Sequence, residues 1–258
     1  MAPEGDKLAQ ELVELGLSAG DVVLVHASLS GTGLDAATLR DALLAAVGED
    51  GTLVVPAFTT DNSDTSSVHL QQVAGMTPTQ AAAFRATMPA FDPATTPSTG
   101  MGRLAESVRT APGAVRSTHP QVSFAALGRR AEELLAEHPL NSHYGEDSPM
   151  GALYRAGARV LLINVGFAVC TAFHLAEYRI GAPARRYRCV VRGADGPEWT
   201  EYEDVTLDDS DFGVIGDAFE AIDENRGQKG QLGRTIARLF SIRDAVDHAV
   251  AWMTEKRP

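Results

Sequence analysis

Cysteine, long apolar runs and basic residues are all scarce in this chain of 258 residues. The two cysteines, Cys170 and Cys189, form no Cys-x-x-Cys pair or Cys/His cluster, which argues against a disulfide framework and a structural zinc site. No stretch approaches the roughly 20 apolar residues that span a bilayer. The 22 Lys and Arg are outnumbered by 34 Asp and Glu, and a net charge of -12 repels the phosphates of nucleic acids. We therefore expect neither nucleic acid nor a membrane as a partner.

Common nucleotide-binding and metal-binding motifs are absent too. The sequence has no GxxxxGK[ST] phosphate loop, no GxSxG nucleophile elbow between a strand and a helix, and no HExxH metal-binding helix. The glycines of residues 226–233 follow no predicted strand, so they are no Rossmann fingerprint. Because no ligand cluster exists, we expect that no metal is bound.

The first 16 residues predict a helix rather than a signal peptide. They are acidic and amphipathic, and Leu8, Leu12 and Leu15 recur at helical spacing up to Gly16. A signal peptide would instead show a basic flank before an apolar run. We therefore expect a cytoplasmic protein.

Buried strands alternate with amphipathic helices in the first part of the chain. The apolar run Val22–Val25 predicts a buried strand, Asp35 can cap the helix that follows, and residues 52–57 predict a second buried strand. A strand, a helix of about three turns and another buried strand form a βαβ unit with parallel pairing. The central sheet is therefore expected to be at least partly parallel.

The second half of the chain predicts one more buried strand, a hairpin and a last helix. Residues 159–165 form an apolar run, and a helix that Thr171 could cap follows Gly166. Residues 187–192 and 198–205 predict an antiparallel hairpin that adds to the same sheet. The last helix is predicted from about Arg243. Together these elements predict a single-domain α/β/α sandwich with a mixed, partly parallel central sheet.

A long polar segment interrupts this alternation at residues 59–101. It is rich in Ser, Thr, Asp, Gly and Pro and has weak periodicity, apart from a short helix predicted at residues 78–86. Long segments of this kind in compact domains are often functional, so we interpret it as a long variable loop or lid.

Two polar segments each follow a predicted buried strand. Residues 26–33 lie at the carboxyl end of the first strand, where open α/β sheets bind ligands. In residues 170–178, His174 and Glu177 would lie one turn apart on the same helix face. A carboxylate beside an imidazole fixes its tautomer and raises its basicity, as a general base requires. The alternatives are a plain strand-to-helix turn and a histidine that caps its own helix.

An acidic run without a single Lys or Arg extends from Glu198 to Glu224. Such a run is usually a solvated face, and about half of its side chains should be no more than that. Several carboxylates on one strand and its following loop could nevertheless form a pocket for a polycation. Asp61 and Asp64 in the long polar segment repeat the pattern.

Seven short segments, taken in order, resemble the antibiotic N-acetyltransferase family, whose best-known members are the aminoglycoside 3-N-acetyltransferases. They extend the resemblance over about residues 8–254. Seven motifs in the right order and spacing are far more specific than any one of them. The matching segments are residues 24–29, 51–56, 91–97, 116–120, 123–126, 148–149 and 171–177.

The resemblance implies the reaction and its catalytic residues. Acetyl-CoA would donate its acetyl group to an amine of an aminoglycoside, the 3-amine of deoxystreptamine, and so confer antibiotic resistance. The family's catalytic histidine corresponds to His174, and Glu177 is the carboxylate of the same motif. The acidic residue that the family carries on the strand after the hairpin is placed at Glu203, so either Glu177 or Glu203 would hold the imidazole. The glycines of residues 226–233 lack the Q/R-x-x-G-x-G/A loop of the GNAT acetyltransferases, so another fold is expected.

The resemblance also implies two binding surfaces. An anionic acetyl-CoA needs N–H groups or basic side chains, and a cationic substrate needs carboxylates. The oxyanion of the reacting thioester would be stabilised by N–H groups of residues 26–33 or by the Ser28 hydroxyl. The residues predicted to bind acetyl-CoA are His26, Ser28, Ser30, Thr99, Gly100, Met101, Gly102, Arg103 and Arg116. Those predicted to bind the amino sugar are Asp61, Asp64, Glu203, Asp204 and Asp208.

Three other functions stay open at this point. Because residues 62–88 are unlike known members of the family, the acceptor could be a different small amine or a biosynthetic amino sugar. A serine hydrolase that uses Ser28 with His174 is disfavoured by the missing nucleophile elbow. A binding protein without catalytic activity is the third alternative, which turnover of acetyl-CoA with any amine would exclude.

Overall fold

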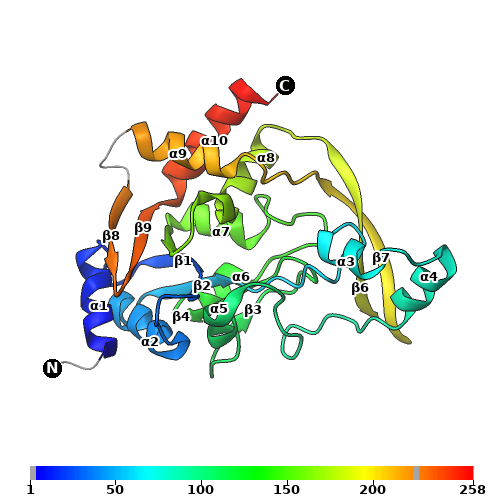
Figure 1. Ribbon diagram of the computed structural model, residues 1–258, viewed down its shortest axis with the longest axis horizontal. Helices are drawn as coiled ribbons and strands as arrows, with labels where there is room; N and C mark the ends of the chain where they lie inside the picture. Colours follow the sequence, from blue (N-terminus) through cyan, green and yellow to red (C-terminus); the bar gives the residue numbers. More distant parts are fainter. Residues whose placement is uncertain (1–3, 223–226, 258) are drawn as a thin grey trace.

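The computed structural model describes residues 4–222 and 227–257. Asp223 and Glu224 of the acidic run and Arg226 of the glycine segment lie outside the described residues. A mixed seven-stranded sheet forms the centre, in the strand order β3-β4-β2-β1-β5-β9-β8 (Figure 1). Its strands are β1 (Val22–Ala27), β2 (Thr52–Pro56), β3 (Val115–Arg116), β4 (Phe124–Gly128), β5 (Arg159–Ile163), β8 (Gly227–Leu232) and β9 (Thr235–Ser241).

The middle of the sheet is parallel and its outer parts are antiparallel. β1 pairs in parallel with β2 on one side and with β5 on the other. β4 and β9 then pair antiparallel with β2 and β5. All five residues of β2 are buried, as expected of a strand covered on both faces. The predicted parallel βαβ unit is confirmed.

Helices cover both faces of this sheet. Alternate residues of β1 point to opposite faces, with Leu24 in one apolar cluster and Val25 in the other. Asp35 caps the second helix as predicted, since its carboxylate accepts a hydrogen bond from the Thr38 N–H at 2.9 Å. One face is covered by α1 (Glu4–Glu14), α2 (Ala36–Val47) and α5 (Gly102–Arg109). The other is covered by α6 (Ala131–Leu135), α7 (Pro149–Ala156), α8 (His174–Arg179), α9 (Phe212–Ile222) and α10 (Ile242–Lys256). The predicted α/β/α sandwich is confirmed.

The predicted hairpin forms, but it does not join the central sheet. β6 (Ala184–Gly193) and β7 (Gly196–Val205) pair with each other as a separate two-stranded sheet. The prediction was wrong on this point because β3 and β8 already occupy the two edges of the central sheet. The hairpin instead extends away from it as a long ribbon (Figure 1).

The segment 59–101 packs against this hairpin. The predicted helix at 78–86 is present as α4 (Pro78–Ala86), whereas the preceding α3 (Ser67–Gln72) was not foreseen. Asn62 fixes the segment to β6, because its side chain exchanges hydrogen bonds of 3.0 and 2.8 Å with the Val190 backbone. Trp199 of β7 donates to the Arg85 carbonyl at the end of α4. The role of the segment as a lid stays a prediction.

No helix within the described residues is long and apolar enough to cross a bilayer.

Candidate active site

A cavity of about 760 Å³ opens where the parallel strands end. His26 lies near the end of β1, and Ser28 and Ser30 follow it in the wall of the cavity. Pro56 at the end of β2 and Val165 just beyond β5 also line it. The carboxyl ends of three neighbouring parallel strands therefore meet at this cavity, which is where α/β sheets bind ligands.

His174 lines the cavity and is oriented by Glu177. The two residues are one turn apart, and His174 Nδ1 lies 2.6 Å from Glu177 Oε2. Glu177 is fully buried, and His174 is 8% exposed. An ionised carboxylate can only accept hydrogen bonds, so we assign the ring proton to Nδ1 and a lone pair to Nε2. This is the tautomer that a general base needs.

The start of this helix differs from the prediction. Thr171 does not cap it, because a 3₁₀ turn spans Thr171–Phe173 and α8 begins at His174. The Thr171 hydroxyl lies 3.3 Å from His26 Nε2 instead. Burial lowers the pKa of His26 to about 4, so this imidazole is neutral at pH 7.

The other oxygen of Glu177 is also occupied. Glu177 Oε1 accepts hydrogen bonds from the Asp208 N–H at 2.9 Å and from Arg257 Nη1 at 2.7 Å. Arg257 follows α10 and also forms a two-pronged ion pair with Asp211. Hydrogen bonding to Asp211 raises the pKa of Arg257, and Glu177 raises it further, although partial burial works against both. The Glu177 carboxylate is thus held between a histidine and an arginine.

Two aromatic rings enclose the imidazole. The Tyr144 ring is stacked on it with centroids 4.6 Å apart, and the Phe212 ring meets it edge-on at 4.7 Å. Burial raises the pKa of the Tyr144 phenol well above its ordinary value, so Tyr144 stays neutral. Neither ring was foreseen from the sequence, because nothing local distinguishes them from core aromatics.

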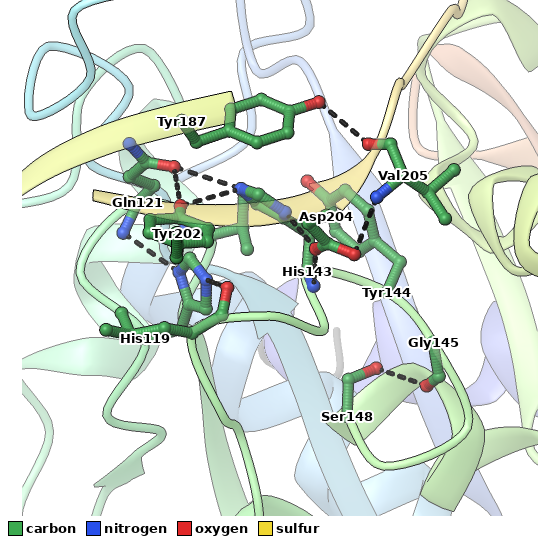
Figure 2. Close-up of polar contacts among 12 residues, drawn as sticks. His119, Gln121, His143, Tyr144, Gly145, Ser148, Tyr187, Tyr202, Asp204 and Val205 are labelled. Atoms are coloured by element: carbon green, nitrogen blue, oxygen red, sulfur yellow. Dashed lines mark hydrogen bonds and ion pairs between the residues drawn. The ribbon is translucent and has the colours of Figure 1, made fainter. Parts of the chain in front are cut away.

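A buried polar network lies next to these rings (Figure 2). Its centre is Asp204, which is 5% exposed. Asp204 Oδ2 contacts His143 Nδ1 and accepts hydrogen bonds of 2.7 Å from the His143 N–H and from the Tyr178 hydroxyl. Burial would raise the pKa of Asp204, but the hydrogen bonds from His143 and Tyr178 outweigh it and leave the pKa below its ordinary value. Asp204 was predicted to bind substrate, and that prediction gains no support from the geometry, because its carboxylate is enclosed and already paired.

The same network reaches both the hairpin and the active site. His143 Nε2 lies 2.9 Å from Gln121 Oε1, which also accepts a hydrogen bond from the Tyr202 hydroxyl of β7. The Tyr178 hydroxyl in turn accepts a 3.3 Å hydrogen bond from the N–H of Tyr144, whose ring covers His174. Figure 2 shows Tyr202 and Asp204 of the hairpin beside His143 and Gln121.

Residues 24–254 match the family model described as aminoglycoside 3-N-acetyltransferase. The chain belongs to this family. A Bacillus subtilis protein named SPbeta prophage-derived aminoglycoside N(3')-acetyltransferase-like protein YokD is 38% identical over 95% of this chain and 90% of its own. Aminoglycoside N(3)-acetyltransferase VII of Streptomyces paromomycinus is 37% identical over 97% of this chain and 91% of its own.

Solved structures of the family share the whole fold. AAC-IIIb in a binary complex with CoASH has a TM-score of 0.84 and 30% identity, with 98% of both chains covered. AAC-VIa bound to sisomicin has a TM-score of 0.84 and 28% identity, with 98% of this chain and 97% of that one covered. The family's members are acyltransferases of this mixed-sheet fold and do not have the GNAT fold, as the sequence predicted.

The predicted acetyl-CoA ligands of this acetyltransferase are largely gathered in the cavity. All but two of them line it: His26, Ser28, Ser30, Gly100, Met101, Gly102 and Arg103. α5 begins at Gly102, and no side chain caps its first N–H groups. Gly102 has a φ of +84°, and a Cβ there would lie 3.4 Å from the Ala27 carbonyl. Glycine adopts this positive φ readily, and the start of α5 lies beside the end of β1 at this point.

Arg116, which was predicted to bind acetyl-CoA, lies outside the cavity lining. It is absent from the cavity wall, and its guanidinium donates to the carbonyls of Ala57 and Thr96 and to the Ser123 hydroxyl. Burial lowers the pKa of Arg116 to about 10. Its donors are thus used to hold the loop around residues 93–96 against the sheet, and this geometry gives no support to a role in binding acetyl-CoA. Thr99 also lies outside the lining, and its hydroxyl donates to Asp61 at 2.7 Å.

The carboxylates that were predicted to orient His174 or to bind substrate differ in where they lie. Glu203 is 71% exposed and lies 3.6 Å from Arg186 on the neighbouring strand, whereas Glu177 contacts the imidazole. Of the two candidates for orienting His174, the structure therefore supports Glu177. Asp208 is exposed beside Glu177, and its neighbour Asp209, which was not singled out, lines the cavity.

Asp61 and Asp64 lie farther along the polar segment. Asp61 is partly buried and accepts the hydrogen bond from Thr99, next to the cavity residue Gly100. Asp64 lies 3.8 Å from Arg188 of β6, and its side chain is 17% exposed. The ion pair with Arg188 makes Asp64 a weaker candidate for a substrate ligand than Asp61.

The geometry gives little support to a serine hydrolase. Ser28 and His174 line the same cavity, but no hydrogen bond within the described residues joins them. Residues 16–20 do carry the letters G-x-S-x-G, yet they lead from α1 into β1. A nucleophile elbow needs the reverse order, from a strand into a helix.

Proposed function

We propose that this chain transfers the acetyl group of acetyl-CoA to an amine of an aminoglycoside, the 3-amine of deoxystreptamine, and thereby confers resistance. The single observation that carries the proposal is the cavity-lining imidazole of His174, whose Nδ1 is engaged by buried Glu177. The family relatives support the reaction class and the substrate class. The proposal includes a cytoplasmic location, where acetyl-CoA is available.

In the proposed reaction His174 acts as the general base. The amine lone pair attacks the thioester carbonyl, a C–N bond forms, and the C–S bond breaks. Nε2 of His174 accepts the proton that the amine nitrogen loses and then passes it to the departing thiolate of coenzyme A, which is released as the thiol. Glu177 stabilises the imidazolium while the proton resides there, and general-base assistance of this kind contributes roughly 10²–10⁴-fold. N–H groups of the loop after β1, or the Ser28 hydroxyl, would stabilise the oxyanion.

Acetyl-CoA would enter from the side of β1 and α5. The uncapped first turn of α5 offers N–H groups and the positive end of a helix dipole, which favour phosphate groups. Arg103 in that turn is exposed and lines the cavity, so its guanidinium can pair with a phosphate. The CoASH complex of the relative AAC-IIIb supports a coenzyme A site in this fold.

The amino sugar would bind on the acidic side of the cavity. Asp209 lines the cavity, Asp208 lies beside Glu177, and Asp61 contacts Thr99 at the edge of the polar segment. Each exposed carboxylate contributes under about 1 kcal/mol to binding an ammonium group, so several must act together. The sisomicin complex of the relative AAC-VIa supports an aminoglycoside as the ligand.

A different amine acceptor is the second candidate function. It is suggested by the long polar segment that carries α3 and α4 and packs on the hairpin, because long segments of this kind are often functional. The test is a thiol-release assay with acetyl-CoA and a panel of aminoglycosides and simple amines, with mass spectrometry of each product. Acetylated aminoglycoside is the expected result. Turnover of another amine, with all aminoglycosides inert, would favour the second candidate.

A further inference from the structure

The two oxygens of Glu177 have different partners. Oε2 contacts Nδ1 of His174 at 2.6 Å, and Oε1 accepts a 2.7 Å hydrogen bond from Nη1 of Arg257. Arg257 lies 80 residues farther along the chain, and its side chain is 18% exposed. A fully buried carboxylate therefore contacts the imidazole of the proposed base through one oxygen and a guanidinium cation through the other.

Arg257 also fixes the segment between the hairpin and α9. Its Nε and Nη2 bind the two carboxylate oxygens of Asp211 at 2.9 and 2.5 Å, and Nη2 donates to the Asp208 carbonyl at 2.7 Å. The backbone N–H of Asp208 donates a hydrogen bond to Glu177 Oε1. One guanidinium thus links the catalytic carboxylate to the acidic segment that borders the cavity.

We propose that Arg257 is a positioning residue for the general base: it compensates the charge of Glu177 through Oε1, so that Oε2 orients His174 without retaining a proton on it. This inference rests on the proposed function of His174. Without Arg257, the buried negative charge of Glu177 would be balanced only by protonated His174. The imidazole would then hold its proton at a higher pH and would be a poorer base near neutrality.

Other charged and titratable groups surround the pair, but they do not replace Arg257. Among the described residues, Arg257 is the only Arg or Lys side chain within ion-pair distance of Glu177. Arg103 lines the cavity from α5 and makes no ion pair with Glu177. The remaining groups around the pair are neutral or acidic: His26 from β1, Tyr144 from the loop before α7, Tyr178 on α8, Asp204 on β7, and Asp208, Asp209 and Asp211 from the segment before α9.

The decisive experiment compares Arg257→Gln with Lys256→Gln. Lys256 is the preceding residue, carries the same charge, and pairs with exposed Glu255, so it is a matched control. The ring protons of His174 are followed by NMR against pH in the enzyme without substrates, with the signal identified by its absence in His174→Ala. In Arg257→Gln we expect the ring to remain protonated to a pH about one unit higher than in the parent enzyme, with no such change in Lys256→Gln. The acidic limb of the pH profile of kcat/KM should move by the same amount.

Further variants separate charge from folding. In Arg257→Lys the titration of His174 should move less than in Arg257→Gln, because lysine keeps the positive charge although it cannot form the two-pronged pair with Asp211. In a Glu177→Gln background, removing Arg257 should move the titration by less than half as much, because the charge that it compensates is gone. If thermal unfolding shows that Arg257→Gln does not fold, Arg257→Met keeps the apolar stem and is subject to the same expectation.

Two results would overturn the proposal. One is an Arg257→Gln enzyme in which His174 loses its ring proton at the same pH as in the parent enzyme. The other is a Lys256→Gln enzyme in which the titration of His174 moves as far as it does in Arg257→Gln. The NMR titration needs no turnover, so it tests the link from Arg257 to His174 even if the base role of His174 fails in activity assays.

Discussion

The Tyr144 ring lies parallel to the His174 imidazole, with 4.6 Å between the ring centroids and 8° between the ring planes. Glu177 fixes the imidazole at Nδ1, and Tyr144 covers one of its faces. Phe212 meets it edge-on. The proposed base is therefore held by one hydrogen bond and two aromatic contacts, with its Nε2 left for the amine.

Replacement of Tyr144 tests whether this stacking matters to the reaction. Tyr144→Phe keeps the ring, so we expect turnover close to that of the parent enzyme. Tyr144→Ala leaves the imidazole free to tilt, and misplacement of a catalytic group by about 1 Å can cost up to roughly 10²-fold. We expect kcat to fall by about 10-fold or more in steady-state assays. Equal kcat values for the Ala and Phe variants would show that the ring only fills space.

Asp204→Asn tests the buried network at pH 7. The substitution leaves His143 and Tyr178 without their shared carboxylate, and breaking buried charged hydrogen bonds costs about 2 kcal/mol or more. We expect the free energy of unfolding in urea to fall by about that amount. The matched control is Glu203→Gln on the same strand, whose carboxylate is exposed and should change stability by less than about 0.5 kcal/mol.

The stability of Asp204→Asn should also depend differently on pH from that of the parent protein. Hydrogen bonds lower the pKa of Asp204 in the folded protein, so its stabilising contribution is complete above the unfolded pKa and is lost as the pH falls through the folded pKa. The difference in unfolding free energy between parent and Asp204→Asn should therefore shrink below about pH 4. A difference that stays constant from pH 7 into this acidic range would contradict the account.

Arg103 and Arg116 are expected to behave differently. Arg103 lines the cavity at the start of α5, so Arg103→Ala should raise the KM for acetyl-CoA, by roughly 10-fold if a phosphate contact worth about 1.4 kcal/mol is lost. Arg116 donates to backbone carbonyls instead, so Arg116→Ala should lower the melting temperature and leave this KM nearly unchanged. If Arg116→Ala raised the KM for acetyl-CoA and Arg103→Ala did not, Arg116 rather than Arg103 would bind acetyl-CoA.

The three parallel strands, β1, β2 and β5, were predictable from the sequence because each is buried on both faces. The apolar runs of β1 and β5 stand out for this reason, and a helix of the expected length separates β1 from β2. β9 was not foreseen, since exposed Ile236 and ion-paired Arg238 interrupt its apolar residues. The hairpin could be identified from its own pattern, but its exclusion from the central sheet depends on which strands occupy the sheet edges.

The candidate site was predictable where its residues are neighbours in the sequence. His174 and Glu177 are three residues apart, so helical spacing alone brings them together. Tyr144 is 30 residues from His174 in the sequence, and Arg257 is 80 residues from Glu177. No local sequence pattern predicts contacts between residues so far apart. Glu203 and Asp204 illustrate a second limit: adjacent strand residues face opposite sides, and the sequence does not say which side is buried.

The central claim is that His174 is the general base, and turnover of the folded His174→Ala enzyme tests it most directly. The variant should retain acetyl-CoA affinity, measured by calorimetry, because the cavity wall formed by β1 and α5 is untouched. We predict that kcat falls by roughly 10²-fold or more, equivalent to about 3 kcal/mol of lost transition-state stabilisation. A folded His174→Ala enzyme with near-parental turnover would contradict the claim.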